Sequence, residues 1–113
     1  MVNLSKLVIA YSFKMESLPA NMVKKRAHLI IAGRVQGVFF RATARDTAKK
    51  LDLTGWIRNN PNGVVESIVE GSEENIKKYI EFCHDGSSAA RVQNVDITWE
   101  DYQEEFDDFN IVR

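Results

Sequence analysis

The sequence predicts an α+β fold in which an antiparallel sheet is covered on one face by two helices. Three observations lead to this prediction. Strand-like and helix-like segments follow one another in the order β-α-β-β-α-β, and a short turn joins the two central strands. The chain of 113 residues is 44% apolar, which suffices for one hydrophobic core and hardly for two. This order matches the ferredoxin-like, split β-α-β sandwich.

The first part of this pattern is a strand, a glycine-bearing loop and a helix. Residues that favour strands occupy Arg26–Ala32 and end at a glycine. Gly33–Val38 contains two glycines within five residues and predicts a tight loop. A helix is predicted over Phe40–Leu53. Its apolar residues recur at helical spacing: Phe40, Ala44, Ala48 and Leu51.

The middle of the chain predicts a hairpin followed by a second helix. Thr54–Asn59 and Val64–Glu70 are strand-like, and the Asn-Pro-Asn-Gly sequence at Asn60–Gly63 between them favours a turn. The second helix is expected to begin after Ser72, whose hydroxyl can cap it, and to end near Gly86. Its buried stripe is expected to consist of Ile76, Tyr79, Ile80 and Cys83.

Two strands are expected in the last part of the chain. The first has polar residues between Gln93, Val95, Ile97 and Trp99. Phe109 and Ile111 indicate a short extra strand near the acidic C-terminal end. Residues 24–113 are therefore expected to form one domain.

Residues 1–23 are expected to be an extension of this domain. They show no sustained period of 2 or of 3.6, and they contain all three methionines: Met1, Met15 and Met22. We interpret the segment as a flexible leader, with Met22 as the functional start. A targeting peptide is disfavoured because the segment contains no arginine.

The composition excludes several classes of protein. The longest purely apolar run, Leu7–Tyr11, is too short for a secretory signal or a membrane-spanning helix, so we expect a cytoplasmic protein without membrane contact. A single cysteine forbids an internal disulfide, and with two histidines no zinc-binding cluster can be assembled. Cys83 lies in the predicted buried stripe, so we expect a core thiol and not a nucleophile.

Charge is distributed unevenly along the chain. The 15 basic and 16 acidic side chains give a formal net charge of −1. Residues 1–58 hold 11 basic and 3 acidic side chains, for a net charge of +8, whereas residues 59–113 hold 4 and 13, for a net charge of −9. This distribution is compatible with a nucleic-acid-binding arm, an acidic tail or a basic anion site.

The loop before the first predicted helix has the features of an anion site. A loop in this position directs successive backbone N–H groups and the helix N-terminus at one point. Glycine allows the sharp turn and the close approach to a ligand. Arg41 follows at once, and its planar guanidinium can bind two phosphate oxygens together. No Gly-Lys-Ser/Thr sequence follows Gly37, so the loop is not a P-loop.

Two motifs closely resemble the signatures of the acylphosphatase family. They are G-R-V-Q-G-V-F-F-R at residues 33–41 and G-W-I-R-N-N-P-N-G-V-V-E at residues 55–66. The resemblance extends over residues 24–113. It implies hydrolysis of acyl phosphates to a carboxylate and inorganic phosphate, without a metal or another cofactor. It also implies that Arg41 binds the phosphate group and that Asn59 orients the attacking water.

The same resemblance assigns the phosphate cradle to the backbone amides of Gly33, Arg34, Val35, Gln36, Gly37, Val38 and Phe39. The loop amides, Arg41 and Asn59 are few groups, but they suffice for the hydrolysis of an acyl phosphate. An acyl phosphate is a mixed anhydride with a good leaving group, so positioning and electrostatic stabilisation suffice without a strong general base. A phosphate oxygen of the substrate is expected to accept the proton from water, and inorganic phosphate is expected to inhibit.

The second motif departs from the family pattern in one position and contains an ambiguity. The pattern usually reads Asn-x-x-Asp-Gly, whereas Asn62 stands here in place of the aspartate, a change that keeps the turn. Asn59 and Asn60 are adjacent, and in a strand only one of them can point at the loop. The family spacing from Trp56 selects Asn59.

Two alternatives remain beside hydrolysis. A non-catalytic acyl-phosphate-binding domain would keep Arg41 and show no turnover, but the presence of Asn59 favours catalysis. An RNA-binding module shares the strand order, yet its third strand needs stacking aromatics, and Val64–Glu70 has none. We therefore expect a monomer whose partners are a small acyl phosphate and inorganic phosphate, with no nucleic acid. Four aromatic residues are expected to form core or pocket wall: Phe39, Phe40, Trp56 and Trp99.

The predicted fold also changes the meaning of the charge asymmetry. Strands from the two halves of the chain interleave in this fold, so most of the opposite charges should mix in space. We expect a basic mouth at Arg34, Arg41 and Arg58, where an anionic substrate is attracted. An acidic surface is expected on the second helix and on the C-terminal segment Glu100–Asp108.

Overall fold

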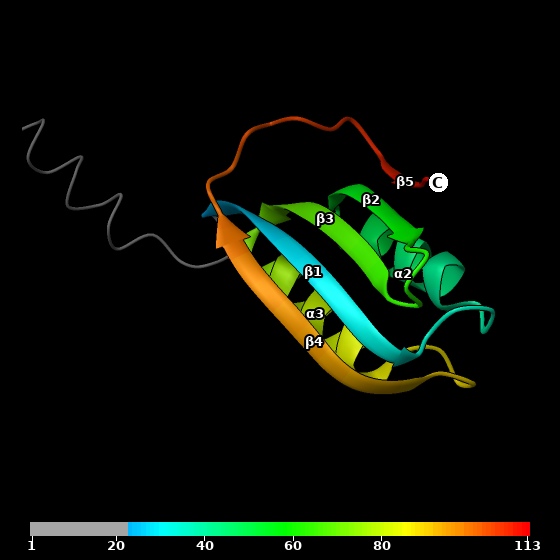
Figure 1. The fold of residues 1–113 in the computed structure, drawn as a ribbon. Helices are drawn as coiled ribbons and strands as arrows, with labels where there is room; N and C mark the ends of the chain where they lie inside the picture. The colour runs from blue at the N-terminus through cyan, green and yellow to red at the C-terminus, as the bar shows by residue number, and fades with distance from the viewer. Residues whose placement is uncertain (1–22) are drawn as a thin grey trace, which may run out of the picture.

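The computed structural model describes residues 23–113, and the leader and the start at Met22 that the sequence predicts lie outside the described residues. The elements follow the predicted order (Figure 1). They are β1 (Lys24–Arg34), α2 (Phe40–Lys50), β2 (Thr54–Asn59), β3 (Val65–Ser72), α3 (Glu73–Asp85), β4 (Arg91–Glu100) and β5 (Phe109–Ile111).

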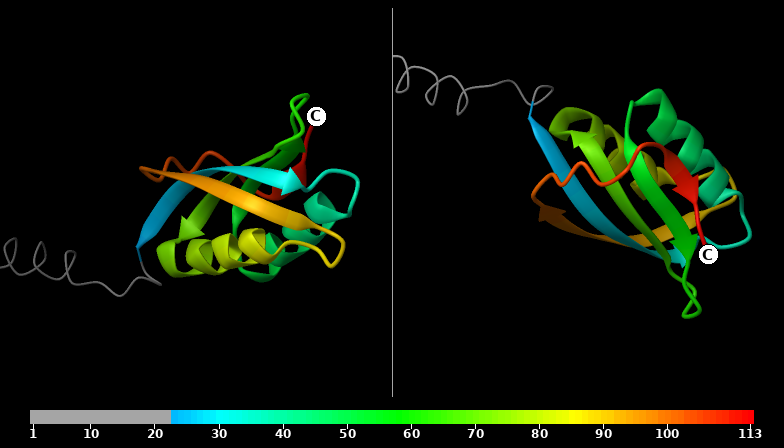
Figure 2. Two further views of the ribbon diagram at one scale, coloured as in Figure 1. Left: turned by 60° about the horizontal axis from the view of Figure 1, so that its bottom comes forward. Right: turned by 90° about the horizontal axis from the view of Figure 1, so that it is seen from above.

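The five described strands form a single sheet in the order β4-β1-β3-β2-β5. The pairs from β4 to β2 are antiparallel, as predicted, whereas β5 runs parallel to β2, so the sheet is mixed. Figure 2 shows the reason: the segment between β4 and β5 crosses the ends of β1 and β3. The chain therefore reaches β2 where β2 begins, and Phe109 pairs with Gly55.

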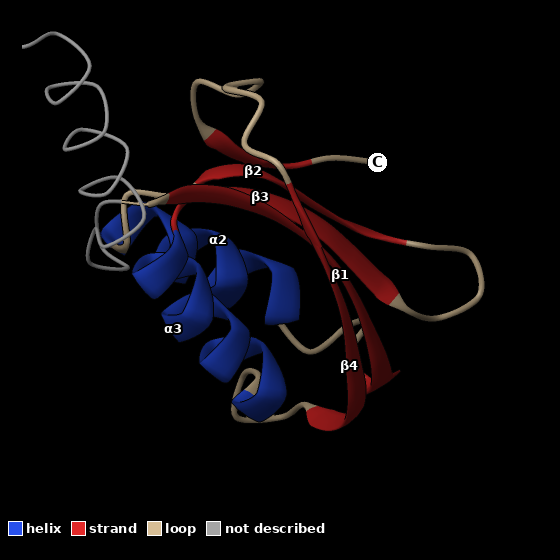
Figure 3. Cartoon of the chain, turned by 90° about the vertical axis from the view of Figure 1, so that its left-hand side faces the viewer, coloured by secondary structure: helices blue, strands red, loops and turns tan. Residues whose placement is uncertain are grey.

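Both helices cover the same face of the sheet, as expected for the ferredoxin-like fold (Figure 3). We call this side the helix face and the opposite side the open face. Alternate side chains of β1 point to the helix face, where Ala27, Leu29 and Ile31 are fully buried. Each fully buried large apolar side chain contributes about 1.5–3 kcal/mol of hydrophobic stabilisation. Neither helix in residues 23–113 is long and apolar enough to cross a membrane.

The first strand is longer at both ends than the predicted Arg26–Ala32. Its pairing with β4 continues past a register shift, so that Gly33 lies opposite Val92 and not in a loop. Gly33 has a φ of +129°, and a Cβ atom there would collide with the carbonyl oxygen of Arg91. Glycine at this position therefore allows β1 and β4 to approach each other closely.

Glu70, a buried acid of β3, anchors the segment between β4 and β5. Its carboxylate accepts hydrogen bonds from the backbone N–H groups of Gln103 at 2.7 Å and Glu105 at 2.9 Å. Arg26 of β1 forms salt bridges with Glu100 at 2.9 Å and Glu105 at 2.8 Å, and lies 3.7 Å from Glu70. The segment is therefore tied to the sheet through its backbone, although most of its acidic side chains are exposed, as the sequence predicts.

Opposite charges from the two halves of the sequence pair in space, as expected. Besides the salt bridges of Arg26, Arg58 contacts Glu66 at 2.8 Å and Lys49 contacts Asp108 at 3.7 Å. In each pair the basic residue comes from the first half of the chain and the acidic residue from the second. The charge asymmetry along the sequence thus does not produce two oppositely charged lobes.

Candidate active site

The topology brings three distant segments to one end of the sheet. β1 and β2 are both antiparallel to β3, and β5 is parallel to β2, so all three strands end on the same side. This end carries the β1–α2 loop (residues 35–39), the turn that follows Asn59, and Ile111 of β5. Arg41 lies in the first turn of α2, directly after the loop.

The β1–α2 loop leaves its backbone N–H groups available to a ligand. Gly37 and Phe39 adopt left-handed conformations, with φ angles of +72° and +61°. No side chain caps the N-terminus of α2, and its first turn contains no acidic residue. Within residues 23–113, none of the backbone N–H groups of residues 35–42 donates to a protein acceptor. Free N–H groups at a helix N-terminus favour an anion.

Two hydroxyl groups hold the loop in this orientation. Ser87 Oγ donates to the carbonyl oxygen of Val38 at 2.6 Å, and Thr43 Oγ1 donates to that of Phe39 at 2.9 Å. In a trans peptide, the carbonyl group of one residue and the N–H group of the next point in opposite directions. Anchoring the carbonyl of Val38 therefore directs the N–H group of Phe39 away from Ser87.

The side chain of Gln36 ties the loop to the β2–β3 turn. Its Nε2 donates to the carbonyl oxygens of Asn60 at 2.8 Å and Val64 at 2.9 Å. Asn60 and Val64 also close the turn, because the N–H group of Asn60 donates to the carbonyl oxygen of Val64 at 2.9 Å. Since Asn59 immediately precedes this turn, the contact holds the loop at a set position relative to Asn59.

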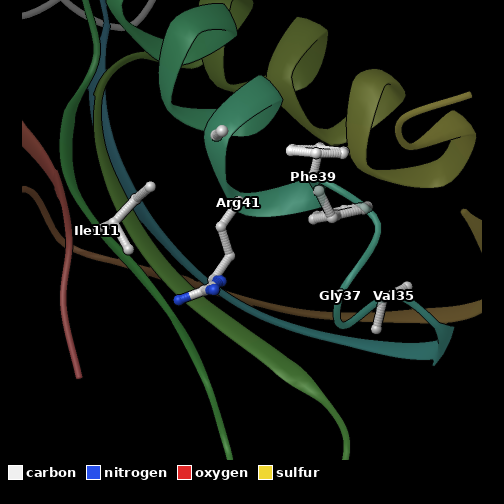
Figure 4. A pocket seen from close by; sticks show the side chains of 7 residues that line it. Val35, Gly37, Phe39, Arg41 and Ile111 are labelled. Atoms are coloured by element: carbon white, nitrogen blue, oxygen red, sulfur yellow. The ribbon is translucent and has the colours of Figure 1, made fainter. Parts of the chain in front are cut away.

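A pocket of about 290 Å³ opens beside the loop. Its size is just below the range for small-molecule sites, which is about 300–1,000 Å³. In Figure 4, the side chain of Arg41 extends between Ile111 and the loop that carries Gly37. The lining consists of Val35, Gly37, Phe39, Phe40, Arg41, Ala42 and Ile111, so the guanidinium is its one charged group.

The structure separates the two adjacent asparagines. Asn59 pairs with Val65, which is buried on the helix face, so the side chain of Asn59 points to that face. Nδ2 of Asn60 donates instead to Glu66, at 3.2 Å. Among the described residues, Oδ1 of Asn59 is a buried oxygen without a hydrogen-bond partner. Buried polar atoms are rarely left unpaired, so this oxygen is available to a water or a ligand.

The residues predicted to form the cradle lie in different surroundings. Three of them line the pocket: Val35, Gly37 and Phe39. Two end β1 and pair with β4: Gly33 and Arg34. The other two are in the loop, where Gln36 contacts the β2–β3 turn through its side chain and Val38 is buried in the core.

Arg58 does not belong to a basic mouth, and that prediction was wrong. It precedes Asn59 in β2 and therefore points to the open face, where its guanidinium lies 5.0 Å from the centre of the Trp56 ring. There it donates to Glu66 at 2.8 and 3.0 Å. Hydrogen bonds lower the pKa of the Glu66 carboxyl to about 2. The largest effect comes from His28 at 2.6 Å, and smaller effects come from Arg58 and Asn60.

Cys83 is buried in the core, as predicted. Burial raises the pKa of its thiol to about 12, so the thiol is neutral at physiological pH and a poor nucleophile.

Of the aromatic residues predicted to form core or pocket wall, Phe40 is buried and Phe39 lines the pocket while 82% exposed. That prediction was wrong for Trp56, which lies against Arg58 on the open face and is part of neither the core nor the pocket lining. It was also wrong for Trp99, which is 41% exposed on β4 and lies outside the core.

Two residues at this end of the sheet were missed by reasoning from sequence. The sequence assigns no role to Ser87, but its hydroxyl donates to the carbonyl oxygen of Val38, 49 positions earlier in the chain. Ile111 was expected only as a strand residue, but it forms one side of the pocket. No local pattern signals either role, because both depend on contacts between segments far apart in sequence.

Comparisons with known proteins agree with this geometry. A family model described as Acylphosphatase matches residues 27–111. The acylphosphatase of Pelotomaculum thermopropionicum is 47% identical over 90 residues, which cover 80% of this chain and 98% of that protein. The fold is similar to the crystal structure of acylphosphatase from Bacillus subtilis, with a TM-score of 0.77, 34% identity, and coverage of 79% of this chain and 99% of that one. The structure of an acylphosphatase from Coxiella burnetii gives a TM-score of 0.75 at 34% identity, covering 79% and 93%.

Proposed function

We propose a mechanism for this site that follows from its family. The chain belongs to the acylphosphatase family, as the family model and the relatives show. The protein hydrolyses the carboxyl–phosphate bond of acyl phosphates to a carboxylate and inorganic phosphate. In our proposal the β1–α2 loop and Arg41 bind the phosphate group, Asn59 orients the attacking water, and no metal ion takes part.

The phosphate group is bound by backbone and side-chain donors together. The N–H groups of residues 35–39 and of the first turn of α2 donate to its oxygens, which their lack of protein acceptors supports. Arg41 donates two parallel hydrogen bonds from its guanidinium. These donors are in place before the reaction and stabilise the charge on the equatorial oxygens of the transition state, where one donor is typically worth about 3–4 kcal/mol.

Asn59 acts on the nucleophile. Its Oδ1 accepts a hydrogen bond from water and directs the water oxygen at the phosphorus atom. A bond forms between that oxygen and phosphorus, the bond from phosphorus to the acyl oxygen breaks, and the electron pair leaves with the carboxylate. The proton passes from water to a non-bridging phosphate oxygen. A strong general base is not needed because the leaving group is good, and the pocket lining contains no His, Asp or Glu.

The unpartnered oxygen of Asn59 carries this proposal. It is buried and lies at the end of the sheet that also presents the uncapped N-terminus of α2 and the guanidinium of Arg41. A buried oxygen without a partner lowers stability unless a bound water or ligand satisfies it. A water bound there during turnover explains why the side chain is tolerated.

Substitution of the two adjacent asparagines tests the proposal. With benzoyl phosphate as substrate and a chelator present, Asn59→Ala is expected to lower kcat about 100-fold. The Ki of inorganic phosphate should change much less, because phosphate binding does not need the water. Asn60→Ala is the matched control and should keep most of the activity, since Asn60 contacts Glu66 on the open face. Equal losses in the two variants, or a requirement for added metal, would contradict the mechanism.

The pH dependence of kcat tests the route of the proton. When a substrate oxygen accepts it, kcat should be flat across the neutral range. A profile governed by a protein group with a pKa near 7 would instead indicate a general base and overturn this step.

The proposal also covers the setting in which the enzyme acts. We propose a monomer that works in the cytoplasm on a small molecule without binding nucleic acid, with residues 24–113 as its domain and residues 1–23 as an extension. In support, β3 carries no aromatic side chain on which a base could stack. Light scattering during gel filtration tests the monomer, and a mass of twice 12.9 kDa would contradict it.

A further inference from the structure

Phe39 is exposed at a position where an aromatic side chain has no structural benefit. It is 82% exposed, and it occupies the N-cap of α2 with a φ of +61°. This left-handed conformation is unfavourable for a bulky residue, whereas glycine or asparagine adopts it readily. The cradle needs only the backbone N–H group of this residue. The ring is not needed to shape the loop, and it lies beside the pocket.

The pocket beside the ring is apolar apart from Arg41. Figure 4 shows Ile111 of β5 on one side of the Arg41 side chain and the loop with Phe39 on the other. The lining includes no acidic side chain and no second cation. A substrate whose phosphate group lies against the loop and Arg41 therefore meets apolar walls with the remainder of its structure.

We propose that Phe39 and Ile111 bind the acyl group of the substrate, and that the enzyme thereby selects acyl phosphates with an aromatic or branched aliphatic acyl group. This inference rests on the proposed function and adds the substrate class to it. An apolar acyl group removes the exposed ring of Phe39 from water and gains contact with it. A carboxylated acyl group finds no free cation in the lining, because Arg41 is engaged by the phosphate.

The selectivity between benzoyl phosphate and acetyl phosphate tests the inference. The quantity measured is the ratio of the two kcat/KM values, expressed for each variant relative to the unsubstituted chain, so that the different intrinsic reactivities cancel. Phe39→Asn keeps the left-handed backbone and replaces the ring by a polar group. It is expected to lower the ratio about tenfold, in the range typical of lost apolar contacts in a specificity pocket. Ile111→Ala should lower it by a smaller factor, and Phe39→Leu should restore part of it.

Two controls separate acyl binding from damage to the cradle. The Ki of inorganic phosphate, which has no acyl group, should shift much less than the ratio in Phe39→Asn. Tyr102→Ala removes another exposed aromatic, 40% accessible and located between β4 and β5, and should leave the ratio unchanged. A parallel loss on both substrates with an unchanged ratio would overturn the inference while leaving hydrolysis intact. Failure of the unsubstituted chain to hydrolyse either substrate would instead overturn the proposed function, and the inference with it.

Discussion

The two helices lie on the same face of the sheet and have similar lengths, 11 and 13 residues, but they begin in different ways. At the start of α3, Ser72 Oγ accepts a hydrogen bond from the N–H group of Asn75 at 3.2 Å, and Glu73 and Glu74 occupy the first turn. At the start of α2, Phe39 provides no side-chain cap and the first turn holds no acid. The start of α3 has protein acceptors for its N–H groups, including the carbonyl oxygen of Val23 for Glu73 at 2.8 Å, whereas the start of α2 is left open.

This difference separates a structural helix start from a functional one. An N-cap side chain and acids in the first turn each stabilise a helix by about 0.5–1 kcal/mol. Both are missing where a phosphate group is proposed to bind, because either would compete with the substrate for the same N–H groups. In the proposed mechanism, the phosphate group of the substrate supplies the missing acceptor.

The largest effect on activity is expected from substitution of Arg41, the cation beside the uncapped start of α2. Arg41→Lys keeps the positive charge but loses the planar pair of donors, so kcat/KM should fall about 100-fold. The free energy of unfolding should change little, because Arg41 forms no salt bridge within the described residues. Steady-state assays with benzoyl phosphate and urea unfolding measure the two quantities. Activity close to that of the unsubstituted chain would show that charge alone suffices.

An acid introduced at the start of α2 should make it resemble α3. A carboxylate in place of Ala42 can accept from the N–H group of Phe39, as in a capping box, and it repels the phosphate group. Ala42→Glu is therefore expected to raise stability by about 0.5 kcal/mol and to lower kcat/KM about tenfold, with a smaller loss at high salt. Ala42→Gln separates size from charge. Equal losses in the two variants would attribute the effect to crowding of the pocket.

Breaking the contact between Gln36 and the β2–β3 turn should have an intermediate effect on activity. Gln36→Met keeps the length of the side chain and removes both hydrogen bonds to the β2–β3 turn. We expect kcat to fall several-fold, with a smaller change in the Ki of phosphate, because the loop shifts relative to Asn59.

Gln36→Glu gives a sharper measurement of the same link. A carboxylate there faces two carbonyl oxygens and disrupts the contact, whereas the protonated acid can donate one hydrogen bond. Activity relative to the unsubstituted chain should therefore rise as the pH falls toward 4. A relative activity that does not depend on pH would count against the positioning role of Gln36.

The smallest effect on activity is expected at the closed helix start. Ser72→Ala removes the cap of α3 and should lower the free energy of unfolding by about 1 kcal/mol, while kcat/KM stays unchanged. Chemical denaturation and the benzoyl phosphate assay check both values. A loss of activity larger than the loss of folded protein would mean that the two helix starts are energetically coupled.

Much of the fold could be predicted because its elements carry strong local patterns. The hairpin turn, the cap at Ser72 and the apolar stripe of α3 each involve neighbouring residues, and all are present in the structure. The parallel pairing of β5 could not be predicted, since it depends on Glu70, which binds the backbone of Gln103 and Glu105 across the end of the sheet. The error at Arg58 was avoidable, because strand alternation places it opposite to Asn59.

By itself, the sequence determined one motif: a glycine loop, a helix start and Arg41 within nine consecutive positions. Residues so close in the chain meet through local backbone geometry alone. Only the tertiary structure decided which asparagine points to the helix face, that Ser87 anchors the loop, and that Ile111 forms a wall of the pocket. Those relations depend on strand order and register, which are set by the packing of segments far apart in sequence.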